Sequence, residues 1–183
     1  MSLIDPARTW AKVEQRLEVE TDAVLRRNLE TILRHMKAEA AGVVDELLDT
    51  LSEDVHYHSY GSTDPALNPQ GKAAVRRFYD DFIASGATRL QLDVDRLVVD
   101  NNCVVTEGVM RMAYPGRTLA IRGIDVDDLD AYYLYETRMA ILWPMDDEGK
   151  VRGEDSYTSG DGFAGIAGRK LQAEDITPLP ARR

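Results

Sequence analysis

The chain has 183 residues and a mass of 20.5 kDa, and its net charge is −10, from 22 basic and 32 acidic residues. This charge argues against a nucleic acid or an anionic membrane as partner, because phosphate groups are bound by basic surfaces. The single cysteine, Cys103, cannot form an internal disulfide, and no apolar run approaches the ~18 residues of a membrane span. We also expect no signal peptide, because no basic segment leads into an apolar one at the N-terminus. Composition therefore predicts a soluble, cytoplasmic protein without a nucleic-acid or membrane partner.

The first third of the chain is predicted to be helical. Asp5-Pro6 is typical of a helix start, and a second start lies near Thr21-Asp22. From Leu25 to Leu48, apolar residues recur at the helical period of 3.6. Gly42 interrupts this stripe and predicts a bend or a break into two helices. We therefore expect an N-terminal helix over residues 5–20, followed by a longer helical pair.

After this helical region, the apolar period changes to two. Residues Val55–Tyr60 alternate and predict a short strand, and Gly71–Ser85 predicts another helix, with Gly86 placed to cap it. Four further strands are expected at Leu90–Val99, Cys103–Tyr114, Ala131–Trp143 and Val151–Thr158. We interpret Gly123–Asp130 as a solvated acidic loop and residues 177–183 as a loosely ordered tail.

This order of elements bears on the fold class. Helices that precede a run of strands indicate an α+β fold rather than an α/β fold. A bent antiparallel sheet with helices on its concave side would enclose a pocket. We expect one domain over residues 1–183, with a core at about 22–160, the N-terminal helix as an extension and the tail at 177–183.

Several segments, in their order and spacing, resemble a known family. They are Asp45-Glu46-Leu47-Leu48, Asp54-Val55-His56-Tyr57-His58, Gly71–Tyr79, the hairpin Val98–Val109, and Gly149-Lys150-Val151-Arg152-Gly153-Glu154. From about Arg26 to about Thr158, the chain resembles the nuclear-transport-factor-2-like superfamily, also called the cystatin-like cone, and within it the SnoaL-like polyketide cyclases. The resemblance implies a conical bent antiparallel sheet wrapped around the N-terminal helices, an internal small-molecule cavity, and frequent dimerisation through the open face of the sheet.

The resemblance does not imply one reaction, because the superfamily includes cyclases, isomerases, dehydratases, epoxide hydrolases and non-catalytic proteins. The catalytic aspartate of the limonene epoxide hydrolases would fall on Ser156, and their Arg and Asp near Gly108 and Met110. That triad is absent, which argues against their mechanism. A reaction like that of the ketosteroid isomerases needs a carboxylate base where Ser59 or Tyr60 stands.

The candidate catalytic residues lie on the first and last strands. They are His58 or Tyr57 on the first strand and Glu154 or Asp155 on the last, and alternation lets only one of each adjacent pair face the cavity. Histidine titrates near neutral pH, and a desolvated carboxyl group has a raised pKa. We expect the two strands to meet the ligand from opposite sides of the cavity. In the alternative interpretation, the histidine is a sheet residue and the carboxylate pairs with an arginine on the outer face.

The histidines are also candidate metal ligands. His56 and His58 share a face of their strand, but the remaining histidine, His35, lies on a helix, so we expect no metal. His35 and Glu39 are four residues apart, and we interpret them as an exposed pair, although Glu39 could reach the mouth of the cavity. The sequence contains no Gly-rich phosphate loop, and we expect no cofactor.

Together these observations predict a protein that binds a small, largely apolar organic molecule. Cofactor-independent acid–base cyclisation, isomerisation or dehydration would fit such a cavity. The alternative is a non-catalytic ligand-binding or enzyme-assembly module of the same fold. Large side chains on both faces of Ala131–Trp143 favour a homodimer joined through the outer face of the sheet.

Overall fold

The computed structural model describes residues 2–178. Its helices are α1 (Arg8–Val19), α2 (Ala23–Ala40), α3 (Val44–Leu48), α4 (Lys72–Ala84) and α5 (Gly116–Ile121), with short 3₁₀ turns at Pro65–Leu67, Ile166–Gly168 and Ala173–Asp175. Its strands are β1 (Leu51–Tyr60), β2 (Leu90–Val99), β3 (Cys103–Pro115), β4 (Tyr132–Pro144), β5 (Val151–Thr158) and β6 (Lys170–Leu171).

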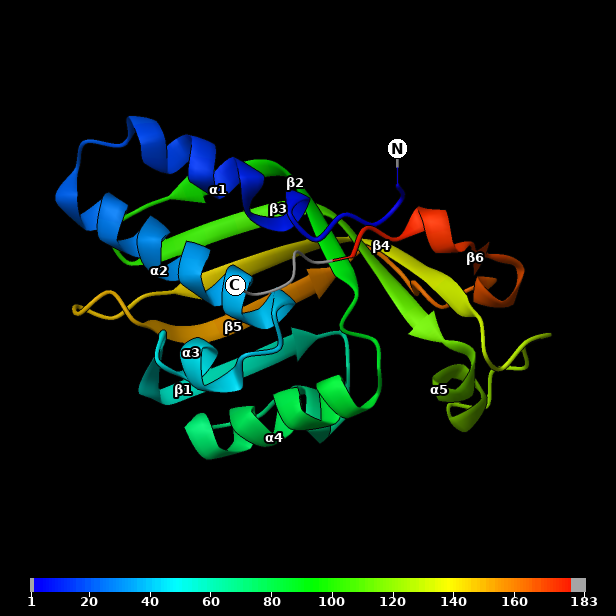
Figure 1. The fold of residues 1–183 in the computed structure, drawn as a ribbon. Coiled ribbons are helices and arrows are strands. Elements are labelled where there is room, and N and C mark those ends of the chain that lie inside the picture. Colours follow the sequence, from blue (N-terminus) through cyan, green and yellow to red (C-terminus); the bar gives the residue numbers. More distant parts are fainter. Residues whose placement is uncertain (1, 179–183) are drawn as a thin grey trace.

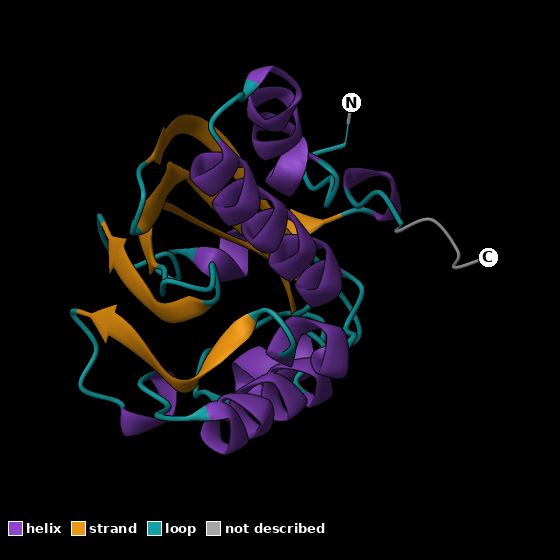
Figure 2. Ribbon diagram, turned by 90° about the vertical axis from the view of Figure 1, so that its left-hand side faces the viewer, coloured by secondary structure: helices purple, strands orange, loops and turns teal. Residues whose placement is uncertain are grey.

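The strands form one curved, unclosed sheet in the order β1-β5-β4-β3-β2, and β6 pairs with β4. All neighbouring strands are antiparallel except β1 and β5, which are parallel. Helices α1 to α4 gather on one side of the curved sheet, with α1 on β2 and α4 beside β1, whereas α5 lies apart beyond the end of β3 (Figures 1 and 2). This arrangement confirms the predicted α+β cone and the antiparallel succession from β2 to β5.

Helix boundaries follow from local hydrogen bonds and backbone conformation. The Asp22 side chain accepts hydrogen bonds from the amides of Val24 and Leu25, which confirms the predicted start of α2. Gly42 has a φ of +64°, a conformation that glycine adopts without strain, and the chain turns there from α2 into α3. The predicted break is therefore present. The first helix, however, begins at Arg8 rather than near Asp5.

Two element predictions were wrong. The first strand begins at Leu51, four residues before the alternation becomes visible at Val55. Helix α5 was missed because its six residues are too few to show a helical period; it is held by burial of Leu119. Of the predicted loose tail, residues 179–183 lie outside the described chain, while the Thr177 amide donates to the carbonyl of Ile4 over 2.8 Å.

The main core fills the space between the helices and the concave face of the sheet. Its largest fully buried members include Trp143, Leu29, Ile32, Met36, Leu47, Leu51 and Leu92. Burial of such side chains supplies the main favourable free energy of folding. None of the helices in the described part of the chain is both long and apolar enough to cross a membrane.

Candidate active site

A cavity of about 430 Å³ lies between α2, α4 and the concave face of the sheet. Its walls are mainly apolar and include Met36, Phe78, Phe82, Leu92, Met110, Met112, Met139, Ile141 and Trp143. This volume falls within the range of about 300–1,000 Å³ typical of sites for small organic ligands. The internal cavity expected from the fold is therefore present.

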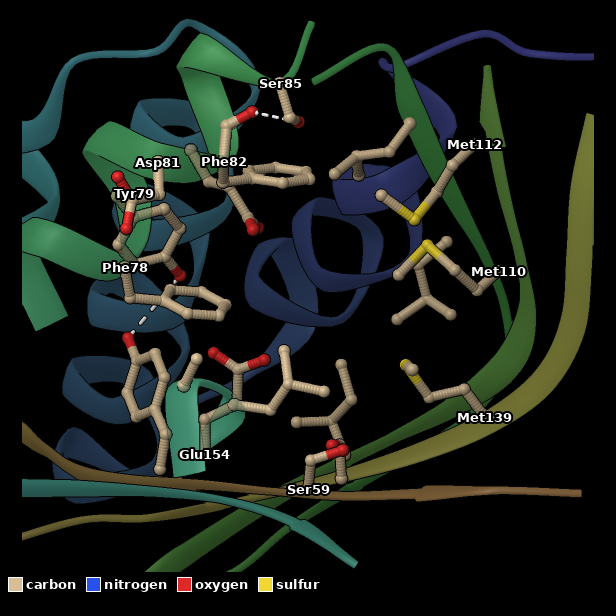
Figure 3. Close-up of a pocket in the computed structure, with 18 of the residues that line it drawn as sticks. Ser59, Phe78, Tyr79, Asp81, Phe82, Ser85, Met110, Met112, Met139 and Glu154 are labelled. Carbon is tan, nitrogen blue, oxygen red and sulfur yellow. Dashed lines mark hydrogen bonds between the residues drawn. The ribbon is translucent and has the colours of Figure 1, made fainter. Parts of the chain in front are cut away.

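Strand pairing decides which predicted site residues share this cavity. In the parallel ladder of β1 and β5, Tyr57 pairs with Glu154 and His58 pairs with Asp155. Tyr57 and Glu154 both line the cavity, and Tyr57 is 3% exposed. Figure 3 shows the Glu154 carboxyl group directed into the space between Phe78 and the methionines. One residue of each adjacent pair thus faces inward.

The other two predicted residues bind each other. Nδ1 of His58 lies 2.8 Å from Oδ1 of Asp155, and the two side chains are 37% and 23% exposed. The His58 ring contacts the ring of His56 at a centroid distance of 3.7 Å and stacks on that of Tyr60. His58 also borders the cavity, but strand alternation directs its imidazole to the outer face of the sheet.

The expected arrangement across the cavity was wrong. After β4 the chain returns and inserts β5 between β4 and β1, so the first and last strands are neighbours in the sheet. Tyr57 and Glu154 are therefore side by side on one wall. Polar groups on the other walls of the cavity come from other strands and from the helices.

Glu39 of α2 is one of these polar groups. Both Glu39 and Glu154 line the cavity. Burial raises the pKa of Glu39 to about 7. Burial also raises the pKa of Glu154 well above its usual range, and the charges of Glu39 and Asp155 add to this effect. Near pH 7, Glu39 is therefore present in both its protonated and its ionised form, while burial favours the protonated form of Glu154.

His35, predicted to be exposed, is fully buried. The prediction failed because the Trp143 ring packs against the His35 ring, with 5.2 Å between the ring centroids. The sheet therefore covers residues of α2 that lie outside its apolar stripe. Nδ1 of His35 lies 2.9 Å from Oγ1 of Thr50, and burial lowers the pKa of His35 to about 3, so the imidazole is neutral.

Tyr79 of α4 joins His35 to the cavity. Its hydroxyl oxygen lies 3.4 Å from Nε2 of His35 and 3.5 Å from the hydroxyl oxygen of Tyr57. Burial raises the pKa of both tyrosines well above 10. Sequence reasoning missed Tyr79 as a site residue, because its place in the apolar stripe of the helix indicated only packing.

The side chains that could bind a metal are dispersed. Within residues 2–178, no group of three or more His, Cys, Asp or Glu side chains is placed to hold a metal ion. The pair formed by His56 and His58 is close together, but its further contacts are with Gln70 and Asp155.

The family of the chain follows from its sequence. Residues 32–131, more than half of the chain, match the family model of the SnoaL-like domain. The chain belongs to this SnoaL-like family. No curated protein matches it.

Solved structures of this fold agree with the family. A protein from Shewanella putrefaciens CN-32, assigned to the SnoaL-like polyketide cyclases, superposes with a TM-score of 0.67 at 11% identity, covering 92% of this chain and 97% of its own. An NTF2-like protein from Anabaena variabilis ATCC 29413 superposes with a TM-score of 0.54 at 18% identity, covering 79% of this chain and 97% of its own. SalBIII, an epoxide hydrolase/cyclase-like enzyme of pyran ring formation in salinomycin, superposes with a TM-score of 0.54 at 13% identity, covering 73% of this chain and 92% of its own. At these identities, the superpositions establish a shared fold and nothing further.

Proposed function

We propose that this SnoaL-like protein binds a small, largely apolar organic molecule and catalyses its cyclisation, isomerisation or dehydration by acid–base chemistry. The observation that supports this proposal is the pair of carboxyl groups, Glu39 and Glu154, in one apolar cavity. Each of these reactions needs a positioned proton donor and a positioned proton acceptor.

Burial raises the pKa of both carboxyl groups, so near neutral pH one can be protonated while the other is ionised. We assign the base to Glu39, whose pKa of about 7 leaves it partly ionised at neutral pH, and the acid to Glu154. The ionised Glu39 would take a proton from one atom of the ligand, and the neutral Glu154 would give its proton to another. In isomerisation or cyclisation the ligand keeps its proton count, whereas in dehydration the proton from Glu154 leaves with the ligand's hydroxyl group as water. In each case the two carboxyl groups exchange protonation states, and proton exchange with water restores them.

The four residues predicted from sequence enter this proposal differently. We propose that Glu154 acts on the ligand and that Tyr57 holds it beside Glu154, because both line the cavity. His58 and Asp155 are assigned to the outer face, where they bind each other.

The proposal can be tested without knowing the natural substrate. The probe is 5-nitrobenzisoxazole, a compact apolar molecule whose ring opens when a base removes one proton. We expect the protein to accelerate this reaction above the buffer rate, with a rate that rises with pH around 7. Glu39→Gln should abolish the acceleration, while Glu30→Gln on the exposed side of the same helix should retain it.

The same assay separates catalysis from binding alone. The neutral fluorophore prodan reports entry into an apolar site by a blue shift of its emission. Prodan binding without acceleration in the wild-type protein would favour the non-catalytic ligand-binding or assembly module. Acceleration that persists in Glu39→Gln would remove Glu39 from the proposed mechanism.

We also propose a homodimer joined through the outer face of the sheet. This face carries Val98, Tyr60 and Tyr157, which are 49%, 47% and 45% exposed, and the two tyrosine rings stack at 4.5 Å. A second copy would remove this apolar surface from water. Light scattering at micromolar concentration tests the proposal, since a mass near 20.5 kDa would contradict it. Tyr157→Glu should convert a dimer to a monomer.

The proposed location of the protein is the cytoplasm. Cys103 is a free thiol, which suits a reducing compartment. Fractionation of the cells that produce the protein tests this location, and recovery in the membrane or secreted fraction would contradict it.

A further inference from the structure

A line of buried polar side chains runs from the loop before β1 to the cavity. It connects Thr50, His35, Tyr79 and Tyr57 through contacts of 2.9, 3.4 and 3.5 Å. The first two residues are fully buried, and the two tyrosines are 2% and 3% exposed. A hydrogen atom can point only one way in each contact, so the direction of one bond determines the next.

The direction is fixed at the end far from the cavity. Oγ1 of Thr50 lies 2.5 Å from the carbonyl oxygen of Leu47. Two oxygens at this distance would repel each other without a proton between them, so the Thr50 hydroxyl donates to Leu47. Thr50 has no second proton and must accept the bond from Nδ1 of His35.

This assignment determines the tautomer of His35 and, through it, the two phenols. Burial keeps the imidazole neutral, so its one ring proton is on Nδ1 and its Nε2 carries a lone pair. Tyr79 therefore donates to Nε2. Its oxygen is left to accept the proton of Tyr57. Both contacts are long for hydroxyl hydrogen bonds, and their direction follows from the short bond at Thr50.

We infer that His35 is a positioning residue that turns the phenol protons of Tyr57 and Tyr79 away from the ligand, so that the cavity recognises ligands whose polar group donates a hydrogen bond, such as a phenol or an enol. The two tyrosine oxygens present lone pairs, beside the carboxyl groups of Glu39 and Glu154. Within this group of four, the carboxyl groups hold the protons that are free to transfer. This inference rests on the proposed function for the identity of the site but not for the direction of the bonds.

Nuclear magnetic resonance tests the direction without a ligand. A long-range ¹H–¹⁵N correlation spectrum of the ¹⁵N-labelled protein distinguishes protonated from unprotonated ring nitrogens. The chain has three histidines, and the variants His56→Gln and His58→Gln identify the signals of His35 by elimination. We expect the Nδ1–H tautomer of His35, unchanged between pH 8 and pH 5.5. The Nε2–H tautomer, or protonation within this range, would overturn the inference.

A pair of variants tests whether Thr50 sets the tautomer. Thr50→Val removes the acceptor for Nδ1, and we expect the Nδ1–H preference to be lost. Thr50→Ser keeps the hydroxyl and should keep the tautomer. Equal spectra in both variants would contradict the assigned direction.

Two probes of nearly equal shape test the ligand class. 2-Naphthol has a hydroxyl donor, and 2-methoxynaphthalene replaces it by an acceptor. We expect 2-naphthol to bind roughly three- to tenfold more tightly, the effect of about one hydrogen bond. In Tyr79→Phe the Tyr57 proton loses its acceptor and can turn to the ligand, so the preference should fall.

Tighter binding of 2-methoxynaphthalene, or no binding of either probe, would overturn the ligand class. The spectrum of His35 would still decide the direction of the bonds. Loss of the 5-nitrobenzisoxazole reaction with the Nδ1–H tautomer intact would instead reject the proposed catalysis alone.

Discussion

Replacing Glu39 by glutamine should make the protein more stable at high pH relative to the wild type. The pKa of Glu39 rises from 4.5 to about 7 on folding because the carboxyl group is buried. A carboxyl group with a raised pKa favours folding below pH 4.5, and this contribution is lost as the pH rises through 7. Above pH 7 the ionised group opposes folding, and the neutral amide of the Glu39→Gln variant removes this opposition.

The magnitude follows from the two pKa values. The difference between 4.5 and about 7 corresponds to about 3 kcal/mol at high pH, at about 1.4 kcal/mol per pKa unit. At pH 5.5 the Glu39 carboxyl group is already ionised in the unfolded state but not in the folded state, and this lowers the free energy of unfolding by about 1.4 kcal/mol. From pH 5.5 to pH 8, the difference in free energy of unfolding between Glu39→Gln and the wild type should therefore shift by about 2 kcal/mol in favour of the variant. These values are upper bounds, because the Glu39 side chain lines the cavity and is only partly removed from solvent.

Urea unfolding at a series of pH values measures this difference directly. A constant effect of the substitution on packing cancels, because only the change with pH is compared. Glu30→Gln is the matched control, since Glu30 lies on the same helix with its side chain 52% exposed. Its unfolding free energy should run parallel to that of the wild type. If the Glu39→Gln curve were also parallel, Glu39 would not be a buried, protonated carboxyl group.

Three further substitutions test other parts of the structure. Gly108→Ala places a methyl group 2.1 Å from the carbonyl oxygen of Asp93, so thermal unfolding should show a loss of roughly 2–3 kcal/mol; an unchanged midpoint would refute this contact. His35 has a pKa of about 3 in the folded protein, so below pH 6.5 it is protonated in the unfolded chain only, and this opposes folding. Between pH 7.5 and pH 5.5, the free energy of unfolding measured in urea titrations should therefore fall by about 1 kcal/mol less in His35→Gln than in the wild type. Parallel curves would count against a neutral buried imidazole. Thr106→Val leaves the buried Nε1 of Trp143 without its 3.0 Å partner, and chemical denaturation should show a cost of about 1–3 kcal/mol, unlike Thr106→Ser.

Most of the fold was predictable because its elements are long enough to show their periods. The helical stripe up to Leu48 and the alternation after Val55 place the change from helix to strand within a few residues of its position in the structure. The expected strands Leu90–Val99 and Cys103–Tyr114 pair as the hairpin of β2 and β3, because the three residues between them, Asp100, Asn101 and Asn102, are suited to a tight turn. Helix α5 is too short for such a signal, and the parallel pairing of β1 with β5 leaves no local mark, because it joins the two ends of the sheet-forming region.

Part of the candidate site could be predicted and part could not. Alternation limited each adjacent pair to one inward residue, and the structure selects Tyr57 and Glu154. The sequence did not determine which residue of each pair this is, since the register between β1 and β5 shifts between Leu51 and His56. A shift of one position exchanges the faces of a strand, so side-chain direction on β5 depends on tertiary contacts.

The helix residues show a deeper limit. His35 and Glu39 lie one turn apart on α2, off the centre of its apolar stripe, which is why an exposed pair was expected. His35 becomes fully buried and Glu39 partly buried because α2 crosses a sheet that curves around it, so more of the helix is covered than a flat contact would cover. The curvature that hides these polar groups also creates the cavity, and it therefore provides the desolvation that raises the pKa of Glu39. In such a cone, polar residues flanking the stripe of the crossing helix are stronger candidates for the site than residues at its centre, whose side chains fill the core.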